Sequence, residues 1–234
     1  MDKILRGVGD FIRRRRPRLR ATFKRLAHGQ NPLALLLTCS DSRVVSSLLL
    51  GTDPGDLFEV RTVGNLIAPA GTRGAASVGD ESEAAAIEYA LLALDVKHLV
   101  VMGHSGCGAM KAVLKGSVPA GAHNLERWLV HAQASQEKLA RTPGIDERLP
   151  PEDRLSQANV LQQIEHIVSY ALVAEQIGRG EVELHGAWFD VERADLHAWS
   201  NAERRFVHMD GDVISRALNR RAAASSRPTT RSMG

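Results

Sequence analysis

The sequence predicts an α/β protein with a mainly parallel central sheet flanked by helices. Two short apolar runs, 33–39 and 98–103, are typical of buried strands, and 57–63 reads as a strand with charged residues at alternate places; helical periodicity lies between the later strands. Parallel strands need crossover connections, so this alternation favours a parallel sheet. Two late candidates, 181–191 and 195–200, bring the expectation to about four parallel strands with an antiparallel strand at the edge.

The helical segments are placed by their apolar spacing and their end signals. Residues 1–28 predict a basic helix that is interrupted near Pro17. A Gly/Ala/Ser-rich loop at 68–80 precedes a second helix, for which Ser77 or Asp80 is the expected N-cap. Further helices are expected at 108–115, 124–141 and 151–178.

Charge divides the chain into a basic N-terminal arm (1–30), one α/β domain (31–221) and a basic tail (222–234) that is expected to be disordered. Residues 1–30 hold ten Lys and Arg against two Asp, whereas the middle of the chain is strongly acidic. We expect the arm to pack on the acidic body of its own or a neighbouring subunit. No aromatic residue interrupts the arginines at 13–20, so stacking on nucleic acid is not predicted.

The sequence predicts a cytoplasmic protein without a transmembrane segment. No apolar run approaches the roughly 20 residues of a membrane helix. The arginines at 13–16 are followed by more charge, which does not fit a signal peptide. Two cysteines are too few for a disulfide framework.

Both cysteines lie in motifs that follow predicted strands. Cys39 stands in "TCSDSRVV" (38–45) with Asp41 and Arg43, and Cys107 stands in "GHSGCGAM" (103–110) with His104. Because the carboxyl ends of parallel strands meet at one edge of a sheet, we expect the two motifs to lie together.

Two thiolates and one imidazole form a natural set of zinc ligands, and three protein ligands leave a fourth position open for catalysis. The alternative is that Cys39 and Cys107 are ordinary buried thiols. A metal site is favoured because all the cysteine of the chain lies in these two motifs. A thiol phosphatase loop and a phosphate-binding P-loop are disfavoured by the short spacing from Cys39 to Arg43 and by the position of Lys111.

The paired motifs "CSDSRV" and "GHSGCGAM" resemble those of the β-class carbonic anhydrases, and the likeness covers roughly residues 25–200. The resemblance implies a zinc (Zn²⁺) enzyme that interconverts carbon dioxide and bicarbonate. It also implies an N-terminal helical arm swapped onto a neighbouring subunit, in a homodimer or a dimer of dimers. By motif position, Cys39, His104 and Cys107 correspond to the zinc ligands, and Asp41 and Arg43 correspond to the family's Asp–Arg pair.

The ligand set suggests how the chemistry runs. Zinc lowers the pKa of a bound water, and the resulting hydroxide attacks carbon dioxide. Two anionic thiolates donate more charge than histidines do, so activity is expected to rise into alkaline solution. If Arg43 holds Asp41 in a bidentate ion pair, the carboxylate orients the hydroxide; if Asp41 instead binds zinc as a fourth ligand, the site is closed.

The sequence departs from the family away from the ligands. In one allosteric subgroup, a Trp, an Arg and a Tyr hold a regulatory bicarbonate, and the corresponding residues here are Leu36, Arg61 and Phe189. Only the arginine is kept, so no such regulatory site is predicted. Other departures are Ser46-Ser47, Thr62 and Ala187.

Two alternative functions remain open from the sequence. The same zinc set could hydrolyse carbon disulfide or carbonyl sulfide, or it could belong to a non-catalytic zinc module that binds a partner. The adjacency of Asp41 and Arg43 to Cys39 favours an enzyme, because a structural site needs no residue to gate an open position.

Overall fold

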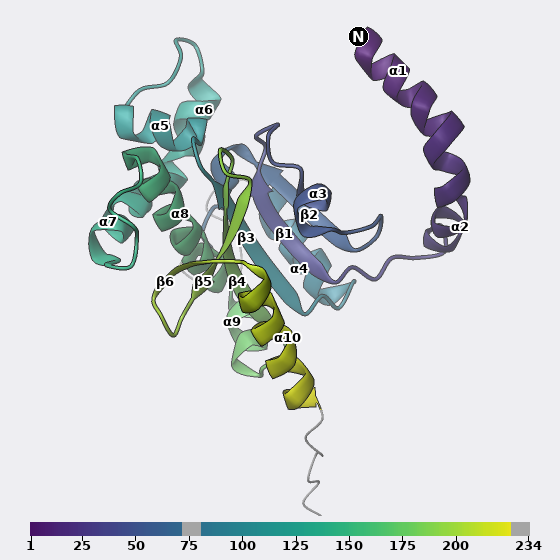
Figure 1. Cartoon of the computed structure of the whole chain (residues 1–234). Coiled ribbons are helices and arrows are strands. Elements are labelled where there is room, and N and C mark those ends of the chain that lie inside the picture. Colours follow the sequence, from purple (N-terminus) through teal and green to yellow (C-terminus); the bar gives the residue numbers. More distant parts are fainter. Residues whose placement is uncertain (72–80, 226–234) are drawn as a thin grey trace, which may run out of the picture.

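A computed structural model of the chain, which describes residues 1–71 and 81–225, contains a six-stranded mixed sheet in the order β2-β1-β3-β4-β5-β6 (Figure 1). The first four strands of this order are parallel, and β5 and β6 are antiparallel to their neighbours. The strands are β1 (Ala34–Cys39), β2 (Leu57–Thr62), β3 (His98–His104), β4 (Glu183–Asp190), β5 (Asp195–Ser200) and β6 (Arg205–His208). The α/β class is therefore confirmed, with one more antiparallel strand than expected.

The strand β6 lies at the edge of the sheet, where β5 was expected. It is only four residues long and begins and ends with the polar residues Arg205 and His208. Its sequence gives no run of alternating apolar residues, so pattern alone does not identify it.

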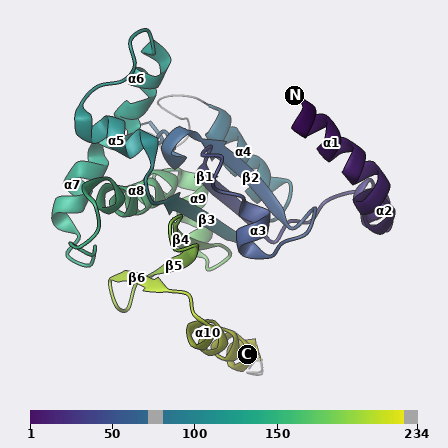
Figure 2. The ribbon, with the colours of Figure 1, turned by 45° about the horizontal axis from the view of Figure 1, so that its top comes forward.

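Alternate residues of the central strands serve two different cores. Leu35 and Leu37 of β1 pack with Leu99 and Val101 of β3 in the larger cluster, to which α4 (Ser82–Leu92), α8 (Pro151–Val168) and α9 (Ala171–Gly178) contribute. These helices lie behind the sheet in Figure 1, and Figure 2 shows the same layers after a rotation. The other face carries a smaller cluster around Leu36, next to the short helix α3 (Ser46–Leu50).

Two of the expected helices are broken in the structure. The segment 124–141 forms α6 (His123–Leu129), a 3₁₀ turn (Val130–Ala132) and α7 (Gln133–Arg141). The segment 151–178 is divided into α8 and α9 at Ser169 and Tyr170. There the hydroxyl of buried Tyr170 donates a hydrogen bond of 2.8 Å to the carbonyl oxygen of Ala68, a contact between distant parts of the chain. The helix α4 begins at Ser82, and the proposed caps Ser77 and Asp80 lie outside the described residues.

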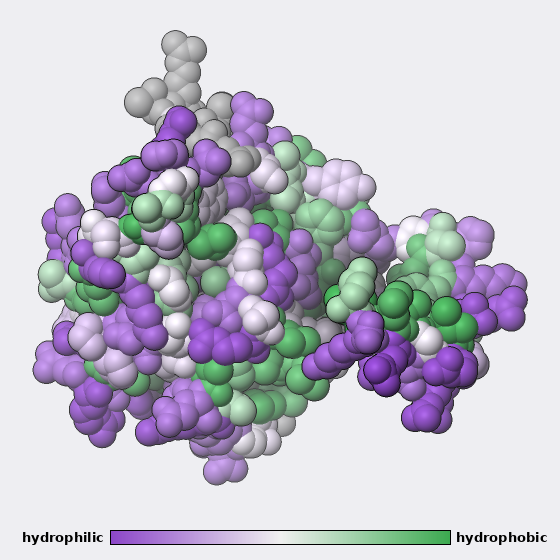
Figure 3. All heavy atoms as spheres, turned by 90° about the horizontal axis from the view of Figure 1, so that it is seen from above, coloured by the Kyte–Doolittle hydropathy of each residue, from purple (hydrophilic) through white to green (hydrophobic). Residues whose placement is uncertain are grey.

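The N-terminal arm is helical from Asp2 to Leu26 and stands away from the body in Figure 1. It consists of α1 (Asp2–Asp10), a π-helical segment (Phe11–Arg15) and α2 (Arg16–Leu26). Pro17 lies in the first turn of α2, where its missing N–H is tolerated. None of the residues in these three segments is buried, and Figure 3 shows apolar side chains beside strongly hydrophilic ones on the arm.

A C-terminal helix, α10 (Gly211–Ser225), follows the sheet and was not expected. It reaches into the segment 222–234, for which disorder was predicted, while 226–234 lie outside the described residues. The division into arm, domain and tail stays a prediction. Among the described helices, none has both the length and the apolar character to cross a membrane.

Candidate metal centre and active site

The sheet brings the two cysteine motifs together. The adjacent parallel strands β1 and β3 end at Cys39 and His104, and Cys107 is the N-cap of α5 (Gly108–Lys115). All three side chains are buried, and their two Sγ atoms and one imidazole nitrogen all lie within 4.8 Å of one another. The two motifs, far apart in sequence, thus form one cluster of metal-ligating groups at the carboxyl edge of the sheet.

His104 is oriented as a metal ligand requires. Its Nδ1 lies 2.9 Å from the carbonyl oxygen of Ser105, to which it donates its proton. This bond leaves Nε2 as the nitrogen with a free lone pair, the arrangement typical of metal-bound histidine. Nε2 is buried and has no hydrogen-bond partner of nitrogen or oxygen among the described residues. Burial lowers the pKa of His104, but Cys39, the carbonyl oxygen of Ser105 and Asp41 together raise it above its ordinary value.

The two thiols face each other and shift each other's pKa in opposite directions. A hydrogen bond from Cys107 lowers the pKa of Cys39 to about 4, against the effect of burial and with the help of His104. The same contact raises the pKa of Cys107, and burial raises it further. A divalent cation bound here would take both sulfurs as thiolates and displace their protons. A buried imidazole nitrogen facing two thiols fits zinc by donor type and number.

Asp41 and Arg43 form a bidentate ion pair beside the cluster. Arg43 donates from Nε to Oδ1 of Asp41 at 2.9 Å and from Nη2 to Oδ2 at 2.8 Å. Nη2 also donates to the carbonyl oxygen of Gly106 at 3.1 Å, which joins the two motifs. The guanidinium holds the pKa of Asp41 below its usual range, and Oδ2 lies 3.8 Å from Nε2 of His104.

Arg61 has a structural use near this pair. Its Nη2 donates to the backbone carbonyl oxygens of Asp41 at 3.0 Å and Val44 at 2.8 Å, and so fixes the turn after Cys39. Leu36 and Phe189, the other two positions of the regulatory site discussed above, are buried apolar residues. The three residues therefore serve packing and backbone support in this structure.

A buried polar layer on α8 and β4 supports the turn between His104 and Cys107. Asp153 accepts a hydrogen bond of 2.6 Å from the backbone N–H of Gly106. Ser156 donates to the carbonyl oxygen of His104 at 2.8 Å and accepts one from the indole N–H of Trp188 at 3.2 Å. Burial raises the pKa of Asp153.

Sequence reasoning missed these supporting residues. The signal was present as spacing, because Asp153, Ser156 and Val160 recur at helical intervals on the predicted helix 151–178. The helix can approach because Gly103 lacks a side chain, since an added Cβ there would come within 2.7 Å of Val160.

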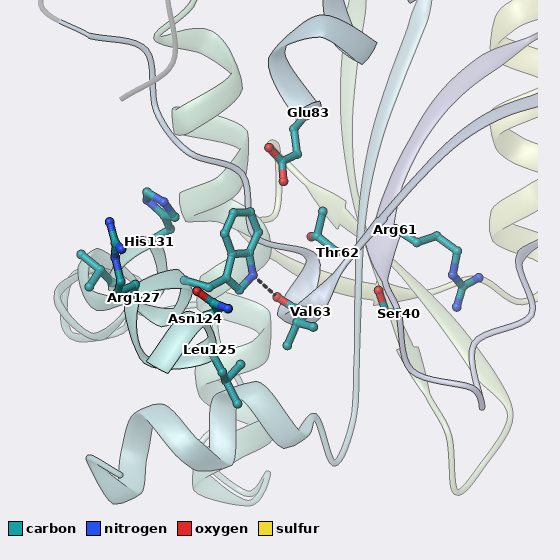
Figure 4. A pocket seen from close by; sticks show the side chains of 11 residues that line it. Ser40, Arg61, Thr62, Val63, Glu83, Asn124, Leu125, Arg127 and His131 are labelled. Carbon is teal, nitrogen blue, oxygen red and sulfur yellow. Dashed lines mark hydrogen bonds between the residues drawn. The ribbon is translucent and has the colours of Figure 1, made fainter. Parts of the chain in front are cut away.

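A pocket of about 970 Å³ is lined in part by Ser40, the residue that follows Cys39 in the sequence (Figure 4). Ser40, Thr62 and Val63 line one side, and residues of α6 line the other. The indole N–H of Trp128 donates a hydrogen bond of 2.8 Å to the carbonyl oxygen of Val63, which connects the two sides.

Comparison with known proteins identifies the family. The family model described as "Carbonic anhydrase" matches residues 34–196. The chain is 36% identical to a carbonic anhydrase of Pseudomonas aeruginosa, covering 89% of this chain and 92% of the relative. It is 35% identical to one of Synechocystis, covering 88% and 74%, and 31% identical to beta carbonic anhydrase 1 of Caenorhabditis elegans, covering 93% and 92%.

Solved structures agree with the sequence comparison. The β-carbonic anhydrase CcaA superposes with a TM-score of 0.81 at 32% identity, covering 89% of this chain and 99% of that chain. Two β-carbonic anhydrases of the filamentous ascomycete Sordaria macrospora, described as tetrameric, give a match with a TM-score of 0.71 at 29% identity, covering 84% and 95%. The matched segment contains both cysteine motifs and the whole parallel part of the sheet. The chain belongs to the β-carbonic anhydrase family.

Proposed function

We propose that this protein catalyses the reversible hydration of carbon dioxide to bicarbonate and a proton, with zinc held by Cys39, His104 and Cys107. The observation that carries the proposal is the convergence of these three buried donors, within 4.8 Å of one another, at the carboxyl edge of the sheet. When bound, zinc supplies a Lewis acid that makes water a nucleophile near neutral pH.

Asp41 acts at this site as a hydrogen-bond acceptor. Its low pKa keeps the carboxylate ionised at neutral pH, so Oδ1 and Oδ2 can accept hydrogen bonds but cannot donate one. Oδ2 is the carboxylate oxygen near Nε2 of His104. There it can accept a hydrogen bond from the O–H of the reacting water and so orient that water. This role agrees with the intact Asp–Arg pair.

Arg43 acts as a positioning residue. Its two parallel bonds take up one lone pair on each carboxylate oxygen of Asp41 and fix the plane of the group. The third bond, to the carbonyl oxygen of Gly106, ties this plane to the turn that carries Cys107. Arg43 thereby opposes a movement of Asp41 into the fourth ligand position.

We also propose that the protein forms a homodimer in which the arm of one copy packs on its neighbour. The arm exposes the apolar side chains of Ile4 (64%), Leu5 (61%) and Val8 (51%), as well as those of Phe11, Ile12 and Phe23. Such a row of exposed apolar residues needs a partner surface. The tetrameric state given for the relatives from Sordaria macrospora agrees with further assembly. Light scattering tests this, because replacing Ile4 and Leu5 with Asp should yield monomers.

The cytoplasmic location stays a prediction.

Zinc analysis paired with stopped-flow hydration of carbon dioxide tests the proposed function. We expect one zinc held by the cysteine motifs and rapid turnover, detected with a pH indicator. Turnover of carbon disulfide or carbonyl sulfide without hydration of carbon dioxide would establish the sulfur-substrate alternative. A zinc-loaded protein without activity on any of these substrates at pH 7 and pH 8.5 would refute an enzymatic role and leave a binding module.

A further inference from the structure

A second group of metal-ligating side chains lies at the opposite end of the sheet. His98 is the first residue of β3, and Glu183 is the first residue of β4 directly opposite it. His185 follows Glu183 by two residues and therefore points to the same face of the strand. The parallel register thus brings two imidazoles and one carboxylate together on neighbouring strands.

The donor atoms of this group form a nearly equilateral triangle. Nδ1 of His98 lies 3.2 Å from Nε2 of His185, and Oε2 of Glu183 lies 3.6 Å and 3.5 Å from these two nitrogens. Ligands at about 2.0–2.1 Å from a tetrahedral zinc ion are separated by about 3.3 Å from one another. The three observed distances are close to that edge length.

The contacts within this group include a hydrogen bond and two ion pairs. The contact between His98 and His185 has a length that suits a hydrogen bond between two imidazoles. The distances from Glu183 to both rings are longer than the 2.7–3.2 Å typical of a hydrogen bond. The carboxylate lies at ion-pair distance from both nitrogens and is nearly equidistant from them, a geometry that also suits an ion shared by the three groups.

We propose that His98, Glu183 and His185 form a second binding site for a divalent transition-metal ion, with Zn²⁺ as the representative ligand. Imidazole suits Zn²⁺, Cu²⁺ and Ni²⁺, and the carboxylate supplies one negative charge. The side chains are 33%, 60% and 43% exposed, in the order given, so water can reach the fourth position. The site is therefore open and binds its ion more weakly and more exchangeably than the buried cysteine cluster.

The second site is independent of the proposed catalytic centre. His98 and His104 stand at the two ends of β3, and six residue steps of about 3.3 Å separate them by roughly 20 Å. The ions therefore share no ligand, and each site can be emptied by mutation without changing the donors of the other.

Zinc binding to the full chain tests the proposal. Protein is dialysed against buffers of fixed free zinc up to about 100 µM, and the metal per chain is measured by mass spectrometry. We expect one tightly held zinc and a second, weaker one. His98→Gln and His185→Gln should each weaken the second site at least 10-fold, and the double variant should lose it, since each removes one of only three protein ligands.

Two controls separate this site from the others. His28→Gln removes an exposed histidine of the arm and should leave both metals in place. Cys107→Ala should lose the tight zinc and keep the weak one, so failure of the proposed function does not affect the outcome. If the variants at His98 and His185 still hold the tight zinc of the cysteine motifs, they are folded.

Three results would overturn the proposal. The wild-type chain could hold no more than one zinc over the whole concentration range. The second zinc could persist in the double variant, or it could disappear equally in His28→Gln.

Discussion

Removing the guanidinium of Arg43 should lower activity without removing zinc. Arg43→Ala deletes the two side-chain bonds to Asp41 and the bond to the carbonyl oxygen of Gly106, but it keeps the backbone N–H bond to Oδ1 of Asp41 and changes no metal-ligating residue. Oδ1 stays held by the backbone N–H of residue 43, whereas Oδ2 loses its hydrogen bond and can turn toward the metal position, since it already lies 3.8 Å from Nε2 of His104. The site is thereby converted in part to its closed form.

The size of the effect follows from the exposure of the pair. Buried hydrogen bonds to charged groups contribute about 1.5–3 kcal/mol each, whereas exposed ion pairs contribute about 0.2–1 kcal/mol. Asp41 is 18% exposed and Arg43 is 46% exposed, so the pair belongs between these limits. A total of about 1–2 kcal/mol corresponds to a fall of roughly 5- to 30-fold in the open fraction, and in kcat/KM with it.

The chain contains a matched control for this measurement. Arg148 makes the same bidentate contact with Asp146, two residues before it, with distances of 2.9 Å and 2.8 Å. This pair contacts none of the cysteine motifs, so Arg148→Ala should leave activity unchanged. Stopped-flow hydration is measured on zinc-loaded proteins of both variants. The reasoning is refuted if zinc-loaded Arg43→Ala stays within 2-fold of the wild type, or if Arg148→Ala loses as much activity.

Three other outcomes are expected. Cys107→Ala should lose both zinc and activity, whereas Asp41→Asn should keep zinc and lose most of the rate; metal analysis and turnover on the same samples check this, and full activity in zinc-free Cys107→Ala would contradict the ligand assignment. Gly103→Ala should reduce the free energy of unfolding by about 1–3 kcal/mol, because its Cβ would come within 2.7 Å of Val160 and overpack the contact with α8; denaturant titration that gives no change would contradict the close packing. Activity should rise between pH 7 and pH 8.5, because thiolate ligands donate more charge to zinc than neutral imidazole does; a pH–rate profile that is flat or falls over this range would exclude it.

The sequence was sufficient to predict the parallel part of the sheet and the meeting of the two motifs. Strands buried on both faces, such as Ala34–Cys39, consist of continuous apolar runs, which are easily recognised. The convergence of Cys39 with His104 then follows from topology, because both end parallel strands. The donor geometry, the tautomer of His104 and the link from Arg43 to Gly106 required the structure.

The features that could not be predicted depend on contacts between distant residues. Helix 151–178 is broken at Tyr170, where the chain turns so that the hydroxyl reaches Ala68. The polar support from Asp153 and Ser156 looks in sequence like ordinary helix positions. The pairing of His98 with Glu183 and His185 depends on the register between β3 and β4, which no local pattern encodes.

The π-helical segment at 11–15 changes the phase of the arm. Nineteen positions separate Ile4 from Phe23, so in a regular helix Phe23 would stand about 100° around the axis from Ile4. A π turn holds about one residue more than an α turn, which sets the following helix back by about 100° and brings Phe23 into line with Ile4. Deleting one arginine from this segment would convert it to a regular helix with the same alignment, whereas deleting two would rotate the halves apart. The arm should therefore tolerate the first deletion as a dimerisation element and fail with the second.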